Sequence, residues 1–167
     1  MLRHTGHNQQ ARKAVTGLYR ALFAAITVGF VAITSAHAQD AKPHRIAIQV
    51  DQDDPAVMNL ALNNAQNVIE YYRDKHEDVD VEIVAYGPGL NMLRADTSPV
   101  KDRIAQIANA DATFPSKIVF SACNNTKQGM EKREGHPITI IPQATIVPSG
   151  VVRIMELEEQ GWSYVRP

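Results

Sequence analysis

From residue 44 to its end, the chain alternates short apolar runs with longer stretches that have helical periodicity. Four runs are rich in β-branched residues and predict buried strands, at residues 44–50, 79–86, 117–122 and 138–142. Residues 162–167 can supply a fifth strand. Strands that alternate with helices of ten or more residues form parallel sheets that are covered on both faces. The sequence therefore predicts one α/β domain of three layers, α/β/α, with a parallel sheet of about five strands.

Four amphipathic helices are predicted between and after these strands. Their capping residues are of the usual types: Asp53 or Asp54 for the first helix, Ser98 for the second and Ser149 for the fourth. Gly135 is expected to end the third helix. The predicted helices cover residues 55–75, 98–110, 126–134 and 150–160.

The first 38 residues have the order of a secretory signal peptide. A basic segment without acidic residues is followed by an uncharged apolar run at 21–33 and by the small residues Ala36 and Ala38. That run is shorter than the roughly 20 residues that cross a bilayer. We expect cleavage after Ala38 and, in a Gram-negative cell, a periplasmic protein; an uncleaved N-terminal anchor is the alternative. Residues 39–43 would form a short polar lead-in to a single domain at 44–167.

The charge and cysteine content of the remaining 129 residues exclude several classes of protein. Four of the 17 basic residues and none of the 18 acidic ones precede residue 39, so the remainder has a net charge of −5. A mildly acidic domain without a basic stripe argues against nucleic acid or an anionic membrane as partner. The single cysteine, Cys123, cannot form an internal disulfide, so the fold must depend on its packing.

Cys123 stands where functional residues of parallel sheets gather. In such sheets, sites form at the carboxyl ends of the strands, here at the loops 51–55, 87–91, 123–126 and 142–148. Cys123 also precedes a predicted helix start, where free N–H groups and the helix dipole favour an anion and lower a thiol pKa. Asn124, Asn125 and Thr126 can cap that helix or donate hydrogen bonds to the sulfur, and Lys127 adds a positive charge.

Three segments resemble the DsrE/DsrF-like (YchN-like) family: "VEIVAYGPGLNML" at 81–93, "FSACNNT" at 120–126 and "IIPQATIVPSGVVRIMELEEQGWSYVRP" at 140–167. Asn64 and Asn67 also fit an Asn-x-x-Asn pattern of that family. The resemblance implies a five-stranded parallel α/β/α fold and assembly into homotrimers or hexamers. It further implies a sulfur-relay role in which Cys123 carries sulfane sulfur as a persulfide. The export signal is a departure, since the well-known sulfur-relay members work in the cytoplasm.

Other patterns in the domain have simpler explanations. Asp51, Asp53 and Asp54 could bind a divalent cation, but helix capping and a solvated loop account for them. Gly87 and Gly89 could let a ligand approach the backbone, although no Gly-x-Gly-x-x-Gly follows that would indicate a dinucleotide site. The three histidines of the domain, His44, His76 and His136, show no metal-ligand spacing. We therefore expect no metal and no cofactor.

Two functions remain open. The first is a sulfur carrier, or a sulfurtransferase component, that works through a Cys123 persulfide, with sulfur donors and acceptors (proteins or small sulfur compounds) as partners. The second is a non-catalytic oligomeric module that binds a small ligand or a partner, in which Cys123 only fills space. Accessibility of the thiol separates the two, because a carrier's sulfur must be reached by donor and acceptor.

Overall fold

The computed structural model describes residues 44–111 and 117–167, and only the backbone of residues 110 and 111. The described residues belong to one compact unit. The predicted signal peptide and polar lead-in, residues 1–43, lie outside the described residues. No helix in the described part of the chain is long and apolar enough to cross a membrane.

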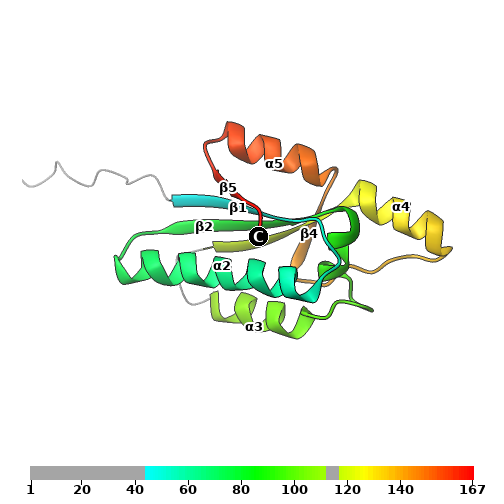
Figure 1. Ribbon diagram of the computed structural model, residues 1–167, viewed down its shortest axis with the longest axis horizontal. Helices are drawn as coiled ribbons and strands as arrows, with labels where there is room; N and C mark the ends of the chain where they lie inside the picture. The colour runs from blue at the N-terminus through cyan, green and yellow to red at the C-terminus, as the bar shows by residue number, and fades with distance from the viewer. Residues whose placement is uncertain (1–43, 112–116) are drawn as a thin grey trace, which may run out of the picture. The chain divides into compact units, whose positions relative to one another are not determined.

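A five-stranded parallel sheet forms the centre of the unit (Figure 1). Its strands lie in the order β4-β3-β2-β1-β5, and every neighbouring pair is parallel. The strands are β1 (His44–Val50), β2 (Val79–Ala85), β3 (Lys117–Cys123), β4 (Ala144–Val147) and β5 (Ser163–Val165). The prediction of a parallel α/β sheet of about five strands is confirmed.

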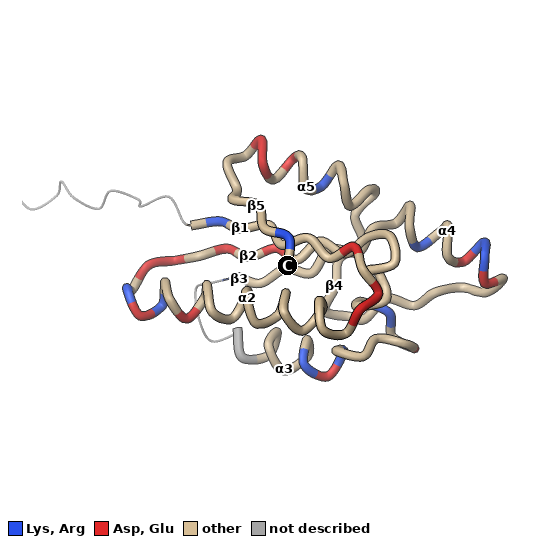
Figure 2. The backbone as a smooth tube through the Cα atoms, in the orientation of Figure 1, with Lys and Arg blue, Asp and Glu red and all other residues tan. Residues whose placement is uncertain are grey.

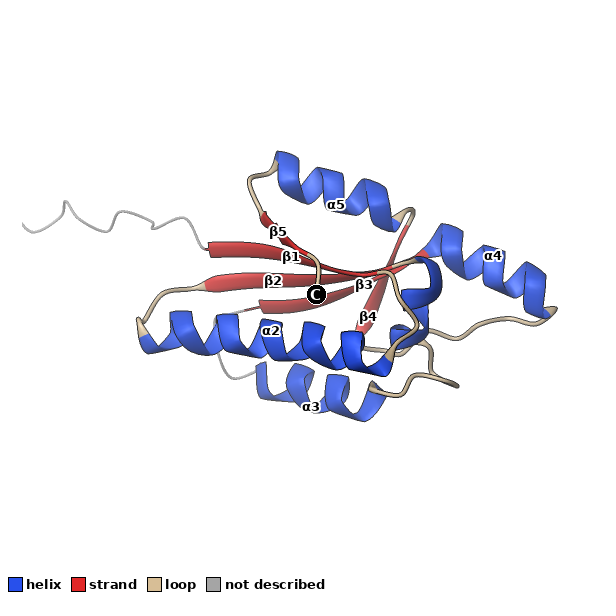
Figure 3. Ribbon diagram, viewed as in Figure 1, coloured by secondary structure: helices blue, strands red, loops and turns tan. Residues whose placement is uncertain are grey.

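The helices lie on both faces of this sheet and at one end of it (Figure 3). α2 and α3 cover one face, α5 covers the other, and α4 extends from the carboxyl end of β3. These elements are α2 (Pro55–Asp74), α3 (Lys101–Asp111), α4 (Asn124–Glu134) and α5 (Gly150–Glu159), with a 3-10 helix, η1 (Gly87–Leu93), after β2. The arrangement confirms the three-layer α/β/α architecture.

Local sequence signals explain where the helices begin and end. The Asp54 carboxylate accepts a hydrogen bond from the backbone N–H of Ala56 at 2.7 Å, and Pro55 occupies the first turn of α2, where its missing N–H costs nothing. Gly135 ends α4 in the left-handed conformation, with φ of 77°, as predicted. Ser149 precedes α5, although its side chain makes no capping hydrogen bond there.

The two faces of the sheet are buried to different extents. The larger core lies under α2 and α3 and includes Phe120 and Ile83, both of which are almost fully buried. The core under α5 is a small cluster of Ala47, Val84, Ile154 and Leu157, with partly buried aromatic residues around it. α5 also has apolar side chains that are half-exposed: Val151, Val152 and Met155.

The predicted strand at 138–142 is wrong. Ile138 and Ile141 are buried, at 3% and 4% exposure, but their segment runs antiparallel to the chain that follows η1, through an isolated bridge between Arg94 and Ile140. The chain joins the sheet only at β4, inside the predicted loop 142–148. Pro142 lacks a backbone N–H, so it cannot continue a ladder of hydrogen bonds into the sheet. The apolar character of this segment therefore reflects burial of a loop in the core.

Two element boundaries also differ from the predictions. α3 begins at Lys101, and the Ile104 N–H donates a helical hydrogen bond to the Val100 carbonyl oxygen at 3.0 Å. The Ser98 hydroxyl accepts from Val100 N–H at 3.3 Å and donates to the carbonyl oxygen of Met92 at 2.5 Å. α4 begins at Asn124, two residues before the predicted start, with Cys123 as its N-cap. The asparagines after Cys123 therefore lie in the first turn of α4 and do not cap it.

Candidate functional site

The sulfur of Cys123 lies at the junction between β3 and α4. β3 ends at Cys123 with extended dihedral angles (φ −68°, ψ 114°), and α4 starts at the next residue. This geometry brings the backbone N–H of Thr126 to 3.4 Å from the Cys123 sulfur, so the thiol itself caps the helix. The Cys123 residue is 4% exposed. The first backbone N–H groups of any helix have no partner within the helix. As the N-cap residue, Cys123 accepts a hydrogen bond from one of them.

The start of α5 approaches the same sulfur. β4 pairs with β3 in a register that sets Val147 beside Cys123, and the Asn125 N–H donates to the Pro148 carbonyl oxygen at 3.2 Å. The chain then enters α5 at Gly150, whose backbone N–H is near enough to the Cys123 sulfur to lower the pKa of the thiol. The sulfur therefore receives backbone N–H groups from the first turns of two helices, and two helix N-termini favour an anion at one place.

Gly150 is the residue that allows this approach. A Cβ added there would lie 2.7 Å from Cβ and 2.9 Å from Cδ1 of Tyr86, closer than real Cβ atoms come. Tyr86 directly follows β2 and packs against the core under α5. The Val-Pro-x-Gly turn thus positions the first N–H of α5 near Cys123 because its glycine has no side chain.

Thr126 joins the thiol to the neighbouring loop. Its hydroxyl oxygen accepts a hydrogen bond from the backbone N–H of Gly87 at 2.9 Å, and the same hydroxyl is hydrogen-bonded to the Cys123 sulfur. Gly87 has φ of 53°, which a residue with a side chain rarely adopts, and this turn directs its N–H toward α4. One hydroxyl thereby connects the loop after β2 with the loop after β3.

Competing effects act on the Cys123 thiol. Burial raises the pKa of Cys123, whereas the Thr126 hydroxyl and the backbone N–H groups of Thr126, Gly150 and Asn125 lower it. The hydrogen bonds together outweigh burial, so the pKa of Cys123 is lowered from its ordinary value of 9.0. The geometry therefore favours the thiolate, which is the nucleophilic form.

Lys127 does not contribute to this site as predicted. Its ammonium group donates to the Glu131 carboxylate at 2.6 Å, one helical turn further along α4. The largest effects that lower the pKa of Cys123 are hydrogen bonds from Thr126, Gly150 and Asn125. Asn124 is half-buried in the first turn of α4, while Asn125 contributes its backbone N–H to the lowering of the thiol pKa.

Gly89 allows its backbone to pack closely against the end of β1. A Cβ added at Gly89 would lie 2.3 Å from the carbonyl oxygen of Val50, at the end of β1. The space that a ligand would need is therefore occupied by the protein's own backbone. Of the two glycines in "GPG", only Gly87 faces Thr126.

The aspartates and histidines of the domain have partners of their own. Asp51 accepts from Arg166, Asp53 accepts from Asn91, and Asp54 caps α2. His44 contacts Glu77 and stacks on Tyr72, and His136 lies 3.6 Å from Glu134. Within residues 44–111 and 117–167, no group of three or more His, Cys, Asp or Glu side chains could hold a metal ion. Basic and acidic residues are interspersed over these residues (Figure 2).

The sequence interpretation missed Gly150 and Tyr86. The glycine after Pro148 was visible as part of the resemblance, but its role depends on a contact with β2 that is distant in sequence. Of the predicted site residues, the structure brings Cys123, Asn125, Thr126 and Gly87 together, and it leaves Lys127 and Gly89 engaged elsewhere.

The sequence matches no protein-family model and no curated protein. Among solved structures it is similar to the protein of unknown function MTH1491 from Methanobacterium thermoautotrophicum, at 28% sequence identity and a TM-score of 0.61. The match covers 74% of this chain and 99% of that chain. This similarity supports the fold and assigns no activity.

Proposed function

We propose that this protein is a sulfur carrier in which Cys123 accepts and releases sulfane sulfur as a persulfide. The observation that carries the proposal is the position of the Cys123 sulfur at the N-termini of α4 and α5, with N–H donors from both. Such donors favour the thiolate, which attacks sulfane sulfur. The resemblance to the DsrE/DsrF-like family, based on the segment around Cys123 and the Val-Pro-x-Gly turn, supports the same role.

The transfer needs no external oxidant. The Cys123 thiolate attacks the outer sulfur of a donor R–S–SH, a sulfur–sulfur bond forms to Cys123, and the donor's own sulfur–sulfur bond breaks. The donor leaves as the thiolate RS⁻, which takes up a proton from water. An acceptor thiolate then attacks the outer sulfur of the Cys123 persulfide, and Cys123 leaves as the thiolate. The proton of the persulfide passes to solvent, so electrons and atoms balance in both steps.

The donors that favour the thiolate also suit the loaded state. A persulfide is anionic at neutral pH, and its charge is shared between the two sulfurs. The N–H groups of Thr126 and Gly150 are fixed by their helices, so they need no rearrangement when the charge moves outward by one sulfur. Thr126 is itself held by Gly87 N–H, which limits the motion of its hydroxyl.

A second function is favoured by one observation, the 4% exposure of Cys123. A buried cysteine that caps a helix could be structural, and the protein would then be an oligomeric binding module. The two functions differ in whether a sulfur donor reaches the native thiol.

Mass spectrometry of the intact native protein after incubation with inorganic polysulfide distinguishes them. A carrier gains the mass of one sulfur atom and loses it again when a small thiol is added, whereas Cys123→Ser gains nothing. The unfolded wild-type protein serves as the control for chemical competence of the thiol. If the unfolded chain is loaded and the native chain is not, the sulfur is sealed in the fold and the carrier function is refuted.

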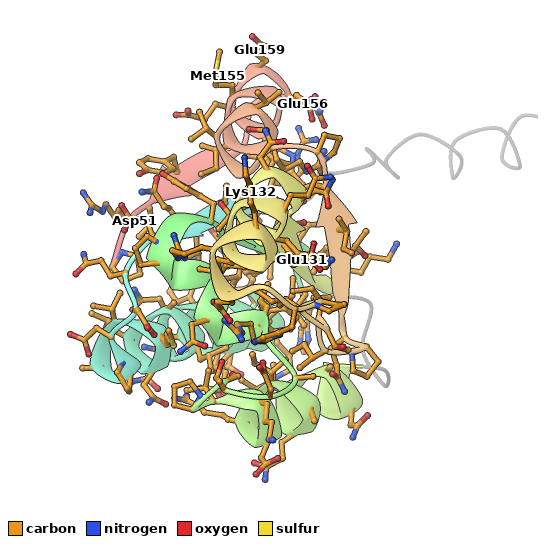
Figure 4. All side chains as sticks on the ribbon, turned by 90° about the vertical axis from the view of Figure 1, so that its right-hand side faces the viewer. Asp51, Glu131, Lys132, Met155, Glu156 and Glu159 are labelled. Carbon is orange, nitrogen blue, oxygen red and sulfur yellow. The ribbon has the colours of Figure 1, made fainter. Side chains whose placement is uncertain are left out.

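A homo-oligomer, a trimer or a hexamer, is proposed as the assembled form. Four apolar side chains of β4 and α5 are half-exposed: Ile146, Val151, Val152 and Met155. β4 is an edge strand, so its outer backbone groups have no partner strand in the sheet. Met155 projects from α5 away from the sheet in Figure 4. A second copy packed here would cover this surface beside the Cys123 loop.

Export to the periplasm is proposed from the sequence of residues 1–38. A signal peptide removed after Ala38 would give a mature chain that begins at Gln39. N-terminal sequencing of the protein from the cell envelope tests this, and a mature chain that retains Arg20 would contradict it.

A further inference from the structure

A pocket of about 520 Å³ lies between η1 and α4, with Gly87 and Thr126 in its wall but not Cys123. Its walls come from three places: Asp53 after β1, the chain from Gly87 to Thr97, and one side of α4. Its volume falls within the range of about 300–1,000 Å³ that is usual for small-molecule sites. The pocket lies at the carboxyl ends of parallel strands, where ligands of such sheets bind.

Gly129 keeps this pocket open. It stands in the middle of α4 and lines the pocket, and a Cβ added there would meet no atom within 4 Å. A glycine in a helix interior destabilises the helix relative to alanine. In the described part of the chain, no neighbouring atom requires the side chain to be missing. The free space above the helix backbone is therefore available to a molecule from outside.

The floor of the pocket is fixed by Arg94. This buried guanidinium makes four hydrogen bonds, two to Asp96 and two to Glu134, at 2.7–3.0 Å. Planar, bidentate pairs of this kind hold the side chains rigidly. Because two carboxylates surround it, the charge of Arg94 is already neutralised, and this cluster alone would repel a simple anion.

Asp53 and Arg133 supply the remaining charges of the pocket wall. One carboxylate oxygen of Asp53 accepts from the Asn91 side-chain amide at 2.7 Å, and Asn91 in turn accepts from the Thr97 hydroxyl. The other Asp53 oxygen has no partner among the described residues. Arg133 likewise makes no ion pair within residues 44–111 and 117–167, although it lines the pocket. The wall thus offers one carboxylate oxygen without a hydrogen-bond partner and one guanidinium that makes no ion pair among the described residues, although its charge acts on the neighbouring Glu134.

We propose that this pocket binds a small zwitterion, a free amino acid or a short peptide, with its ammonium group on Asp53 and its carboxylate on Arg133. A ligand with a single negative charge would be repelled by Asp53 and Glu134, and a ligand with a single positive charge would be repelled by Arg133. Met130 and Pro88 provide apolar wall for a side chain. The inference does not rest on the proposed sulfur chemistry, since Cys123 does not line the pocket.

The probes are L-glutamine and L-alanyl-L-glutamine, added to ¹⁵N-labelled full chain and followed by two-dimensional NMR. Saturable shifts of the Gly129 and Thr126 amides are expected. N-acetyl-L-glutamine lacks the ammonium group and L-glutaminamide lacks the carboxylate, so each should bind at least several-fold more weakly. Cys123→Ser should bind the probes as the wild type does, which keeps this test apart from that of the sulfur carrier.

Two variants test the location of the site. Gly129→Leu fills the pocket and should abolish saturable binding, and Arg133→Gln should weaken it about two- to fivefold, as expected for an exposed ion pair. Lys132→Gln is the matched control, because Lys132 does not line the pocket and lies on the side of α4 nearer α5 in Figure 4. Circular dichroism checks that Gly129→Leu folds, and Arg133→Gln carries the test if it does not.

No saturation by either zwitterion at about 10 mM, a range where sites of millimolar affinity fill, overturns the proposal. So does equal binding of the analogues that lack one charge, or equal weakening by Lys132→Gln.

Discussion

Gly150→Ala should raise the pKa of the Cys123 thiol and destabilise the fold. The added Cβ would lie 2.7 Å from Tyr86 Cβ and 3.1 Å from its Cγ, so either α5 or β2 must give way. The nearest atom is a Cβ, which side-chain rotation of Tyr86 does not move. The first turn of α5 is the element with fewer neighbours, since a single small cluster anchors it to the sheet. We expect this turn to shift away and to take the Gly150 N–H with it.

The size of both effects follows from the contacts that are lost. Overpacking of this kind costs about 1–3 kcal/mol, and the better helix propensity of alanine offsets up to about 1 kcal/mol of it. The free energy of unfolding should therefore fall by about 1–2 kcal/mol. A hydrogen bond to a charged group contributes about 1.5–3 kcal/mol, and one pKa unit corresponds to about 1.4 kcal/mol. Loss of the Gly150 donor should therefore raise the pKa of Cys123 toward its ordinary value.

Thiolate ultraviolet absorbance against pH measures this pKa without requiring that a reagent reach the buried sulfur. Urea unfolding at one pH measures the change in stability. Gly129→Ala is the matched control, because it is also a glycine-to-alanine change in a helix, but its Cβ meets nothing within 4 Å. It should stabilise the protein by about 0.5–1 kcal/mol and leave the thiol pKa unchanged. A wild-type pKa and stability in Gly150→Ala would refute the account of how α5 is positioned.

Three further predictions concern charge and assembly. Since the pKa of Cys123 is lower in the folded than in the unfolded protein, the thiolate's contribution to stability is lost as pH falls through the folded pKa. Urea unfolding should therefore show that wild type gains stability over Cys123→Ser as pH rises from that folded pKa to the ordinary thiol value of 9.0; a constant difference would contradict it. Glu82 is 2% exposed and accepts from Arg153 and Ser121 at 2.6–2.7 Å, so Glu82→Gln should cost about 1–3 kcal/mol of unfolding free energy. Glu156→Gln, which alters the exposed partner of Arg153 at 3.6 Å, should change it by less than about 0.5 kcal/mol in the same assay. Met155, 54% exposed on α5, should act at an interface, so light scattering should show smaller particles for Met155→Asp than for wild type; a wild type that is already monomeric would argue against the proposed oligomer.

The sequence predicted those elements whose signals are local. Asp54, Pro55 and Gly135 act within one helical turn, so α2 and the end of α4 could be predicted from neighbouring residues. Buried strands such as β1 and β2 are continuous apolar runs, because helices cover both faces of a parallel sheet. The candidate site was found in part for the same reason: Cys123 and Thr126 lie within one strand-to-helix junction.

The fourth strand was predicted at the wrong segment because an apolar run indicates that residues are buried, but not which segment their backbone pairs with. β4 is an edge strand of four residues, and its two central residues are exposed, so it has little apolar signal. The segment 138–142 is more apolar because Ile138 and Ile141 fill the core, although it pairs only with the chain after η1. Edge strands carry a weak pattern for this reason.

The position of β4 also explains which contacts of the candidate site could not be predicted from the sequence. The register that sets Val147 beside Cys123 places the next three residues, Pro148 to Gly150, against the start of α4. Whether Gly150 meets the sulfur then depends on Tyr86 at the end of β2, which is more than sixty residues away in the chain. A helix start after Cys123 is a local feature, and one such start stabilises a thiolate only modestly. The second helix start lies there because three parallel strands end side by side, so the surroundings that lower the pKa of Cys123 depend on the tertiary fold.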